Sequence, residues 1–144
     1  MFFDTNVLVR ARFEAAPGHL LARRRMSEIG RTDEPLRISR QVLREYLATV
    51  TRPQAWSVQV PMEEALEHVA RLVGVFGLLE DGPGVTDMLA ALCRTVPVAG
   101  RQIHDANIVA TMLSHGERRL VTFNGRDFRR YGDRIELFDL ETDA

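Results

Sequence analysis

Short apolar segments alternate along this chain with longer stretches whose apolar residues follow a helical period. The short segments predict strands at residues 2–3, 36–38, 78–79, 120–123 and 135–138. The longer stretches predict a helix that starts near residue 7, helices over 19–29, 62–76, 85–96 and 101–114, a helix between a Ser39 N-cap and Pro53, and a short helix within 124–131. Parallel strands need crossover connections, which are usually helical. The sequence therefore predicts an α/β fold with a short parallel central sheet flanked by helices on both faces.

Length and composition limit what this fold can be. A chain of 144 residues fits one domain, so we expect a single domain over residues 1–144. Hydrophobic residues make up 45% and charged residues 27%, which is typical of globular proteins. The longest segment without polar side chains, residues 72–79, is much shorter than the roughly 18–20 residues that span a bilayer. Because Asp4 interrupts the apolar start, no secretory signal is predicted, and we expect a cytoplasmic protein without membrane association.

Charge and cysteine content exclude further classes. The single cysteine, Cys93, rules out an internal disulfide and a thiolate metal cluster, and its apolar neighbours predict that it packs in the core. The formal net charge is −1, from 19 basic and 20 acidic residues, and every basic residue is an arginine. A nucleic acid would therefore have to be bound by local groups rather than by overall charge.

Asp105 is the acidic residue whose position is least expected. On a helix over residues 101–114 it falls within the apolar arc, between Val109 and Met112. An ionised carboxylate in such a place is costly unless a cation or several donors meet it, and burial alone would raise its pKa. A metal ion is the simplest explanation, and a buried arginine partner is the alternative.

Three more acids are candidates for a ligand-binding site. Asp4 follows the first predicted strand, at the sheet edge where open α/β proteins bind ligands, although Asp4 or Thr5 could instead cap the next helix. Glu45 lies at the border of the apolar stripe of its helix, so it could face either solvent or a neighbouring cleft. Asp127 follows the strand at 120–123, in a short helix that Asn124 could cap.

These carboxylates, taken together, describe a site for a hard cation. Oxygen ligands without cysteine or suitably spaced histidine suit Mg²⁺ or Mn²⁺ and are poor for Zn²⁺. Such an ion can activate water and neutralise a scissile phosphate, while a carboxylate orients or deprotonates the water. The pattern thus indicates phosphoryl chemistry.

Four segments in a fixed order carry a resemblance to a known family. They are Asp4-Thr5-Asn6-Val7-Leu8, residues 39–53 with Glu45, Ile103-His104-Asp105-Ala106-Asn107-Ile108-Val109-Ala110, and Thr122-Phe123-Asn124-Gly125-Arg126-Asp127-Phe128. Together they resemble the PIN-domain ribonucleases and, among these, the VapC toxins of bacterial and archaeal toxin–antitoxin pairs. The match runs nearly end to end, with two departures: Asn124 stands where many relatives carry Asp, and fewer residues precede Asp4.

The resemblance implies a PIN-like fold and a metal-dependent endoribonuclease that acts as a toxin. It implies that Asp4, Glu45, Asp105 and Asp127 bind Mg²⁺ or Mn²⁺ and carry catalysis, with Asp4 and Asp105 as the most direct ligands. Thr5, Asn6, Thr122 and Asn124 would support the cluster through hydrogen bonds. The implied partners are an RNA substrate, a cognate antitoxin and a second copy of the chain in a homodimer.

Two binding surfaces can be suggested from the positions of residues. Arg126, Arg129 and Arg130 follow or flank Asp127, which makes them candidates for contacts to RNA phosphates. An antitoxin tail would cover the acidic site, while its amphipathic helix would bury the apolar face around Leu20 and Leu21.

Other functions remain as alternatives. A PIN-fold module could bind RNA or a protein without cleaving, although an acid is present in all four segments. A phosphatase with a strand-end nucleophile at Asp4 would want a second Asp two residues on, where Asn6 stands. No G-x-S-x-G segment is present for a serine hydrolase.

Overall fold

Five parallel strands form the centre of the protein in the computed structural model, which describes residues 1–142. They are β1 (Phe2–Phe3), β2 (Arg37–Ser39), β3 (Gly77–Leu79), β4 (Arg119–Thr122) and β5 (Glu136–Asp139), and their order across the sheet is β3-β2-β1-β4-β5. The helices are α1 (Thr5–Arg12), α2 (His19–Gly30), α3 (Arg40–Val50), α4 (Met62–Val75), α5 (Pro83–Thr95), α6 (Gln102–Ser114) and α7 (Gly125–Phe128), followed by the 3₁₀ turn η1 (Arg129–Tyr131). This arrangement confirms the predicted α/β fold.

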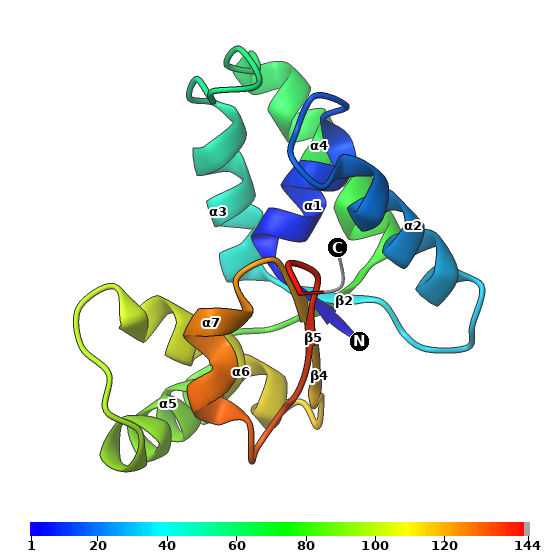
Figure 1. The fold of residues 1–144 in the computed structure, drawn as a ribbon. Coiled ribbons are helices and arrows are strands. Elements are labelled where there is room, and N and C mark those ends of the chain that lie inside the picture. The colour runs from blue at the N-terminus through cyan, green and yellow to red at the C-terminus, as the bar shows by residue number, and fades with distance from the viewer. Residues whose placement is uncertain (143–144) are drawn as a thin grey trace.

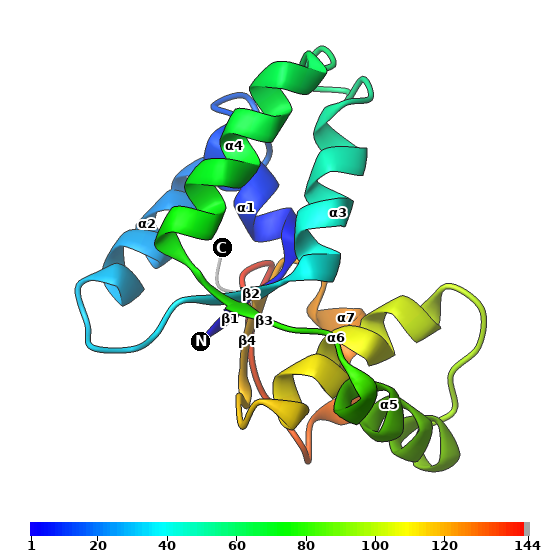
Figure 2. The ribbon, with the colours of Figure 1, turned by 180° about the vertical axis from the view of Figure 1, so that it is seen from behind.

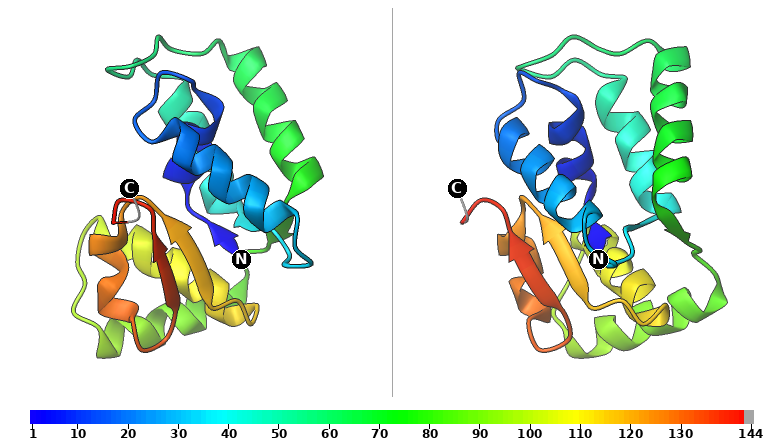
Figure 3. Two further views of the ribbon diagram at one scale, coloured as in Figure 1. Left: turned by 45° about the vertical axis from the view of Figure 1, so that its right-hand side comes forward. Right: turned by 90° about the vertical axis from the view of Figure 1, so that its right-hand side faces the viewer.

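Helices cover both faces of the sheet. Helices α1 to α4 gather on one side and α5 to α7 on the other, as the opposite views in Figures 1 and 2 show. Figure 3 shows the same division from the side, with the short strands lying between the two groups. Because both faces are covered, the central strand β1 is fully apolar and both of its phenylalanines are completely buried. No helix in residues 1–142 is long and apolar enough to cross a membrane.

The register of the central strands sets the position of the site. Phe2 pairs with Arg37 of β2 and with Leu120 of β4, and the backbone N–H of Asp4 donates to the Val121 carbonyl at 3.0 Å. Since the strands are parallel, the residues that follow β1, β2 and β4 reach the same edge of the sheet. The helices α1, α3 and α7 begin at this edge.

Local capping explains where these helices begin. Ser39 accepts a hydrogen bond from the backbone N–H of Val42 at 3.4 Å, so the predicted N-cap of α3 is confirmed. Helix α1 begins at Thr5, earlier than predicted, because the Asp4 side chain accepts from the Thr5 N–H at 2.8 Å. Asp4 is therefore both a helix cap and a residue of the sheet edge.

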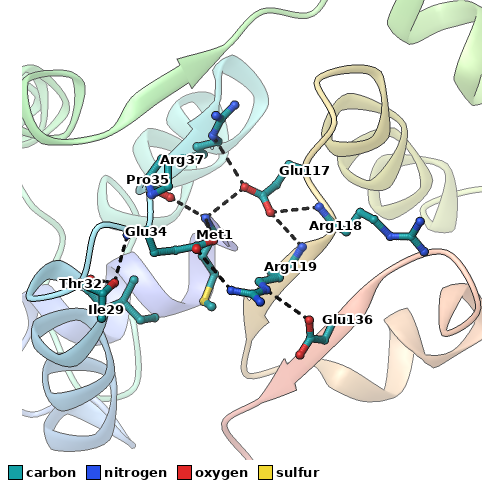
Figure 4. A network of polar contacts seen from close by, with 10 residues as sticks. All are labelled: Met1, Ile29, Thr32, Glu34, Pro35, Arg37, Glu117, Arg118, Arg119 and Glu136. Carbon is teal, nitrogen blue, oxygen red and sulfur yellow. Dashed lines mark hydrogen bonds and ion pairs between the residues drawn. The ribbon is translucent and has the colours of Figure 1, made fainter.

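Ion pairs connect the elements at the opposite edge of the sheet, where the strands begin (Figure 4). The ammonium of Met1 lies 3.1 Å from Glu34 and 3.0 Å from Glu117, and Arg119 contacts Glu34 at 3.3 Å and Glu136 at 3.2 Å. The ammonium and Arg119 lower the pKa of Glu34. This network ties the start of β1 to the segment before β2 and to β4 and β5, so its role is structural.

The prediction for Cys93 was wrong, and the prediction of a single domain stays a prediction. Cys93 is exposed, so the prediction of core packing was wrong: the buried stripe of α5 contains Val85 and Leu92, and Cys93 lies about 100° beyond Leu92 around the helix. The buried apolar side chains form one cluster. That residues 1–144 form one domain stays a prediction, and residues 143–144 lie outside the described part of the chain.

Candidate active site

Three of the four predicted acids line one cleft at the edge where α1 and α3 begin. Asp4 follows β1, Glu45 lies in the middle of α3, and Asp105 lies in the first turn of α6. The cleft has a volume of about 710 Å³ and is also lined by Asn124. Segments that are far apart in sequence therefore supply acids to one space.

Asp4 is the most buried of these acids, with 7% of its surface exposed. Its carboxylate accepts hydrogen bonds from the Thr5 N–H at 2.8 Å, the Thr122 hydroxyl at 2.6 Å and the Asn6 amide at 3.1 Å. Burial nevertheless raises the pKa of Asp4 to about 6, helped by the charges of Glu45 and Asp105 and opposed by the hydrogen bonds from Thr122 and Thr5. No cation neutralises this carboxylate within residues 1–142.

Asp105 is partly buried, and its carboxylate has neither a hydrogen bond nor an ion pair in the described residues. Burial, together with the charges of Asp127 and Glu45 and opposed by that of Arg130, raises its pKa to about 6. The alternative of a buried arginine partner therefore has no support in residues 1–142. Asp4 and Asp105 thus both lack a directly contacting cation among the described residues.

Glu45 turns toward the cleft rather than toward bulk solvent. One carboxylate oxygen accepts from the Thr5 hydroxyl at 2.8 Å and the other from the Gln41 amide at 2.8 Å. Gln41 is 6% exposed, and the same amide donates to the His104 carbonyl at 2.8 Å. The Asn107 amide in turn donates to the Gln41 oxygen at 2.9 Å. This chain of amides fixes the orientation of Glu45.

Sequence reasoning missed the role of Gln41 and Asn107. Gln41 lies one helical turn before Glu45, on the same face of α3, which was the available signal. Asn107 lies within the segment around Asp105, but its contact with α3 depends on how the two helices meet. Asn107 also donates to Asp81 at 3.0 Å, so the network extends to the segment after β3.

Asp127 lies beside the cleft and does not line it. The Asn124 amide donates to its carboxylate at 2.7 Å, and the Asn124 backbone N–H donates to the Thr122 hydroxyl at 2.9 Å. Asn6 joins the same group by donating to Thr122 at 3.3 Å and accepting from the Phe123 N–H at 3.0 Å. Thr5, Asn6, Thr122 and Asn124 thus all contact the acids or each other, and their supporting role in catalysis stays a prediction.

Comparison with known proteins identifies the family. The sequence matches the PIN domain over residues 1–134. The chain belongs to the PIN domain family. No curated protein matches it. Solved structures with low sequence identity also match this chain, and three of them are described below.

The first of these structures is VapBC2 from Rickettsia felis bound to a promoter DNA fragment, with 17% identity, 96% of this chain and 98% of that chain covered, and a TM-score of 0.68. The second is VapC20 from Mycobacterium tuberculosis, described as a Sarcin-Ricin loop cleaving toxin, with 17% identity, coverage of 89% and 92%, and a TM-score of 0.69. The third is a toxin–antitoxin complex from Klebsiella pneumoniae, with 18% identity, coverage of 88% of each chain and a TM-score of 0.63. At these identities the likeness shows the fold.

The arginines that line the cleft of this PIN domain differ from those suggested by the sequence. Arg126 and Arg129 line a separate hollow, where Arg129 lies 3.4 Å from Asp139, and Arg130 donates to the Pro97 carbonyl at 3.3 Å. Their contact with RNA stays a prediction. The acidic cleft itself is lined by four other arginines, Arg10, Arg44, Arg52 and Arg101. Proximity in sequence to Asp127 did not reveal these residues, because α1, α3, the turn after α3 and the residue before α6 bring them to the cleft.

The donor chemistry of this PIN site fits a hard divalent cation. Asp4 and Asp105 both have a raised pKa and no neutralising partner in the described residues, which is the condition that a bound cation would relieve. Within residues 1–142, no three Asp, Glu, His or Cys side chains lie close enough together to form a complete metal cluster. Asp4 and Asp105 could supply the one or two carboxylates through which Mg²⁺ usually binds to a protein.

Proposed function

We propose that this protein is a Mg²⁺- or Mn²⁺-dependent endoribonuclease that acts as the toxin of a toxin–antitoxin pair. The observation that carries the proposal is the pair of uncompensated acids, Asp4 and Asp105, at the edge of a cleft that arginines also line. The negative charge of these two carboxylates creates a need for a bound cation. The arginines of the cleft can bind phosphates, so a polyanion such as RNA can approach the acidic centre. The family supports the same activity, since PIN domains include ribonucleases.

Each acid has a distinct role in this mechanism. Asp4 and Asp105 would hold the ion, which supplies positive charge for the scissile phosphate and acidifies bound water. Glu45 is fixed by Thr5 and Gln41 at the cleft wall, where its carboxylate can orient or deprotonate the attacking water. Asp127 acts on Asp105 through its charge, and this additional negative charge would strengthen the attraction for the ion.

An apolar groove on the side of α1 to α4 supports the antitoxin as a partner. The groove has a volume of about 380 Å³, and its apolar lining includes Leu8, Met26, Leu72 and Val75. Leu20 on α2 is 76% exposed. Such a surface fits the apolar face of an amphipathic helix, and the Klebsiella relative is itself a toxin–antitoxin complex. A homodimer and a cytoplasmic location are further parts of the proposal.

One observation favours a second function. Because no three-residue metal cluster is present in residues 1–142, a PIN module that binds RNA or protein without cleavage is the competing candidate. Cleavage decides between the two.

The test is cleavage of single-stranded RNA by the purified full chain with Mg²⁺ or Mn²⁺. We expect cleavage that stops in EDTA, returns with either ion and does not return with Zn²⁺. Asp4→Asn and Asp105→Asn should be inactive, whereas Asp87→Asn, at an exposed position on α5, should keep full activity. Binding without cleavage under any divalent ion would support the competing function, and undiminished cleavage in EDTA would contradict the metal requirement.

A further inference from the structure

The cleft that holds the acids is also lined by basic and aromatic side chains. Arg44, Arg52 and Trp56 line it together with Ala48 and Thr49. Arg44 and Arg52 are exposed, and their side chains make no hydrogen bond or ion pair in the part of the chain that the structure describes. Two guanidinium groups without a partner in the described residues and a half-buried indole ring therefore line the same cleft.

Helix α3 and the turn that follows it form one wall of the cleft. Gln41, Glu45 and Ala48 recur at helical spacing on α3 and line the cleft, and Arg52 lines it from the turn beyond Val50, where α3 ends. From Glu45 to Val50 the helix axis advances by roughly 7.5 Å. Arg52 is thus separated from Glu45 along this wall by more than one helical turn, and the small residue Ala48 lies between them in the sequence.

Trp56 is held in place by the loop that follows α3. The backbone of Gln54 donates to the Ser57 carbonyl at 2.8 Å and accepts from the Ser57 N–H at 3.3 Å, and the Gln54 amide donates to the Thr49 carbonyl at 2.9 Å. On one side the indole packs against Phe13, with ring centroids 5.5 Å apart. The indole N–H has no acceptor within residues 1–142. The ring is therefore positioned before any ligand binds.

We propose that Arg44, Arg52 and Trp56 form a subsite for a nucleotide that flanks the scissile phosphate of single-stranded RNA. Arg44 and Arg52 bind backbone phosphates, and the indole of Trp56 stacks on an unpaired base. Aromatic stacking requires a base that is free of a duplex, which selects single strands. The inference rests on the proposed nuclease function for the identity of the ligand. An acidic peptide, such as an antitoxin tail, is the competing ligand for the two arginines, but it offers nothing that needs the indole.

The sequence offers a direct probe of this subsite, because Trp56 is the only tryptophan among the 144 residues. Its fluorescence in the full-length protein is measured in EDTA, so that cleavage does not interfere, during titration with a short single-stranded oligoadenylate. We expect quenching that saturates with the single strand. A poly(A)·poly(U) duplex and polyglutamate should leave the emission unchanged.

Variants and a labelled RNA test the individual contacts by fluorescence anisotropy. Trp56→Leu keeps the apolar contact with Phe13, and it should weaken RNA binding about fivefold to a hundredfold, as expected for the loss of one stacked base. Arg44→Gln and Arg52→Gln should each weaken binding and reduce the slope of log affinity against log salt by about one. Arg94→Gln, at an exposed position on α5 outside the cleft, should change neither quantity. Circular dichroism of each variant verifies that it is folded.

The results of these experiments test the Trp56 subsite independently of the proposed nuclease activity. Emission that stays constant while the labelled RNA binds would overturn it, as would equal quenching by the duplex. Quenching by polyglutamate would assign the subsite to an acidic peptide instead. A chain that shows the expected quenching but cleaves no RNA with Mg²⁺ would leave the subsite standing and refute only the nuclease.

Discussion

Replacing Asp105 with asparagine should stabilise the metal-free protein at neutral pH, even though the residue belongs to the proposed active site. The Asp105 carboxylate accepts no hydrogen bond in residues 1–142, so an amide of nearly the same shape breaks no contact. The substitution removes a charge that lies near Asp127 and Glu45. The expected gain is therefore electrostatic and can be worked out from the pKa.

The magnitude follows from burial and from neighbouring charge. These raise the pKa of Asp105 from 3.8 to about 6, a difference that corresponds to roughly 3 kcal/mol for a fully buried carboxyl. Because Asp105 is only partly buried, screening by water reduces the expected gain to about 1–2 kcal/mol, or roughly 3–8 °C in melting temperature. The native pKa is higher than the unfolded one. The cost of the ionised carboxylate is thus complete above about pH 6 and absent below about pH 4, where both states are protonated.

Thermal unfolding in EDTA measures this gain at neutral pH and near pH 4. Asp105→Asn should melt higher than the parent protein at neutral pH and at the same temperature near pH 4. Asp87→Asn removes an exposed acid from α5 and should match the parent at both. Added Mg²⁺ should stabilise the parent more than Asp105→Asn. A variant that melts lower than the parent in EDTA at neutral pH would refute the reasoning, and so would a gain that persists near pH 4.

Three more outcomes are expected. Gln41→Leu removes the donor that orients Glu45, so kcat should fall about tenfold or more with little change in KM. Gln59→Leu, in the exposed loop after α3, should leave both constants unchanged. The same kcat and KM for the two variants would contradict a positioning role for Gln41. The two carboxyls with a raised pKa of about 6 become protonated as the pH falls, so Mg²⁺ affinity measured by calorimetry should be much lower near pH 5 than at neutral pH, and equal affinities would contradict their role as ligands. In Gly125→Ala the new Cβ would lie 2.1 Å from a carboxylate oxygen of Asp139 on β5 and 2.7 Å from the Asp139 Cβ, so the free energy of unfolding, measured with urea, should fall by about 1–3 kcal/mol. Gly74→Ala, in open space on α4, should leave this free energy unchanged or raise it.

The fold was predictable because its signals are local. Strand β1 is a short apolar run, β4 contains the apolar pair Leu120 and Val121, and Pro53 and Gly116 follow closely on the ends of α3 and α6. The start of α1 was misplaced because its cap, Asp4, doubles as a site residue. Cys93 was misplaced because its apolar neighbours in sequence belong to a stripe that it does not join.

The site was predictable only in part. Asp105 could be found because a carboxylate conflicts with the apolar arc of its own helix. Gln41 shares a face of α3 with Glu45, but its contacts with the His104 carbonyl and Asn107 depend on how α3 meets α6, and Arg52 lies in the turn after α3. Arg126 and Arg129 were chosen for their nearness to Asp127 along the chain, yet the turn after β4 directs them to a different hollow.

The position of β1 in the middle of the sheet has a consequence for how the protein folds. Phe2 pairs with Arg37 on one side and with Leu120 on the other, so the central strand is complete only after a loop of nearly the whole chain has closed. Closure of such loops is slow, because entropy is lost before contacts are gained. Asp4 receives its shortest hydrogen bond from Thr122, at the end of that same loop. Partly folded chains that lack the β1–β4 pairing therefore have no assembled cleft, and the proposed toxic activity requires this long-range pairing.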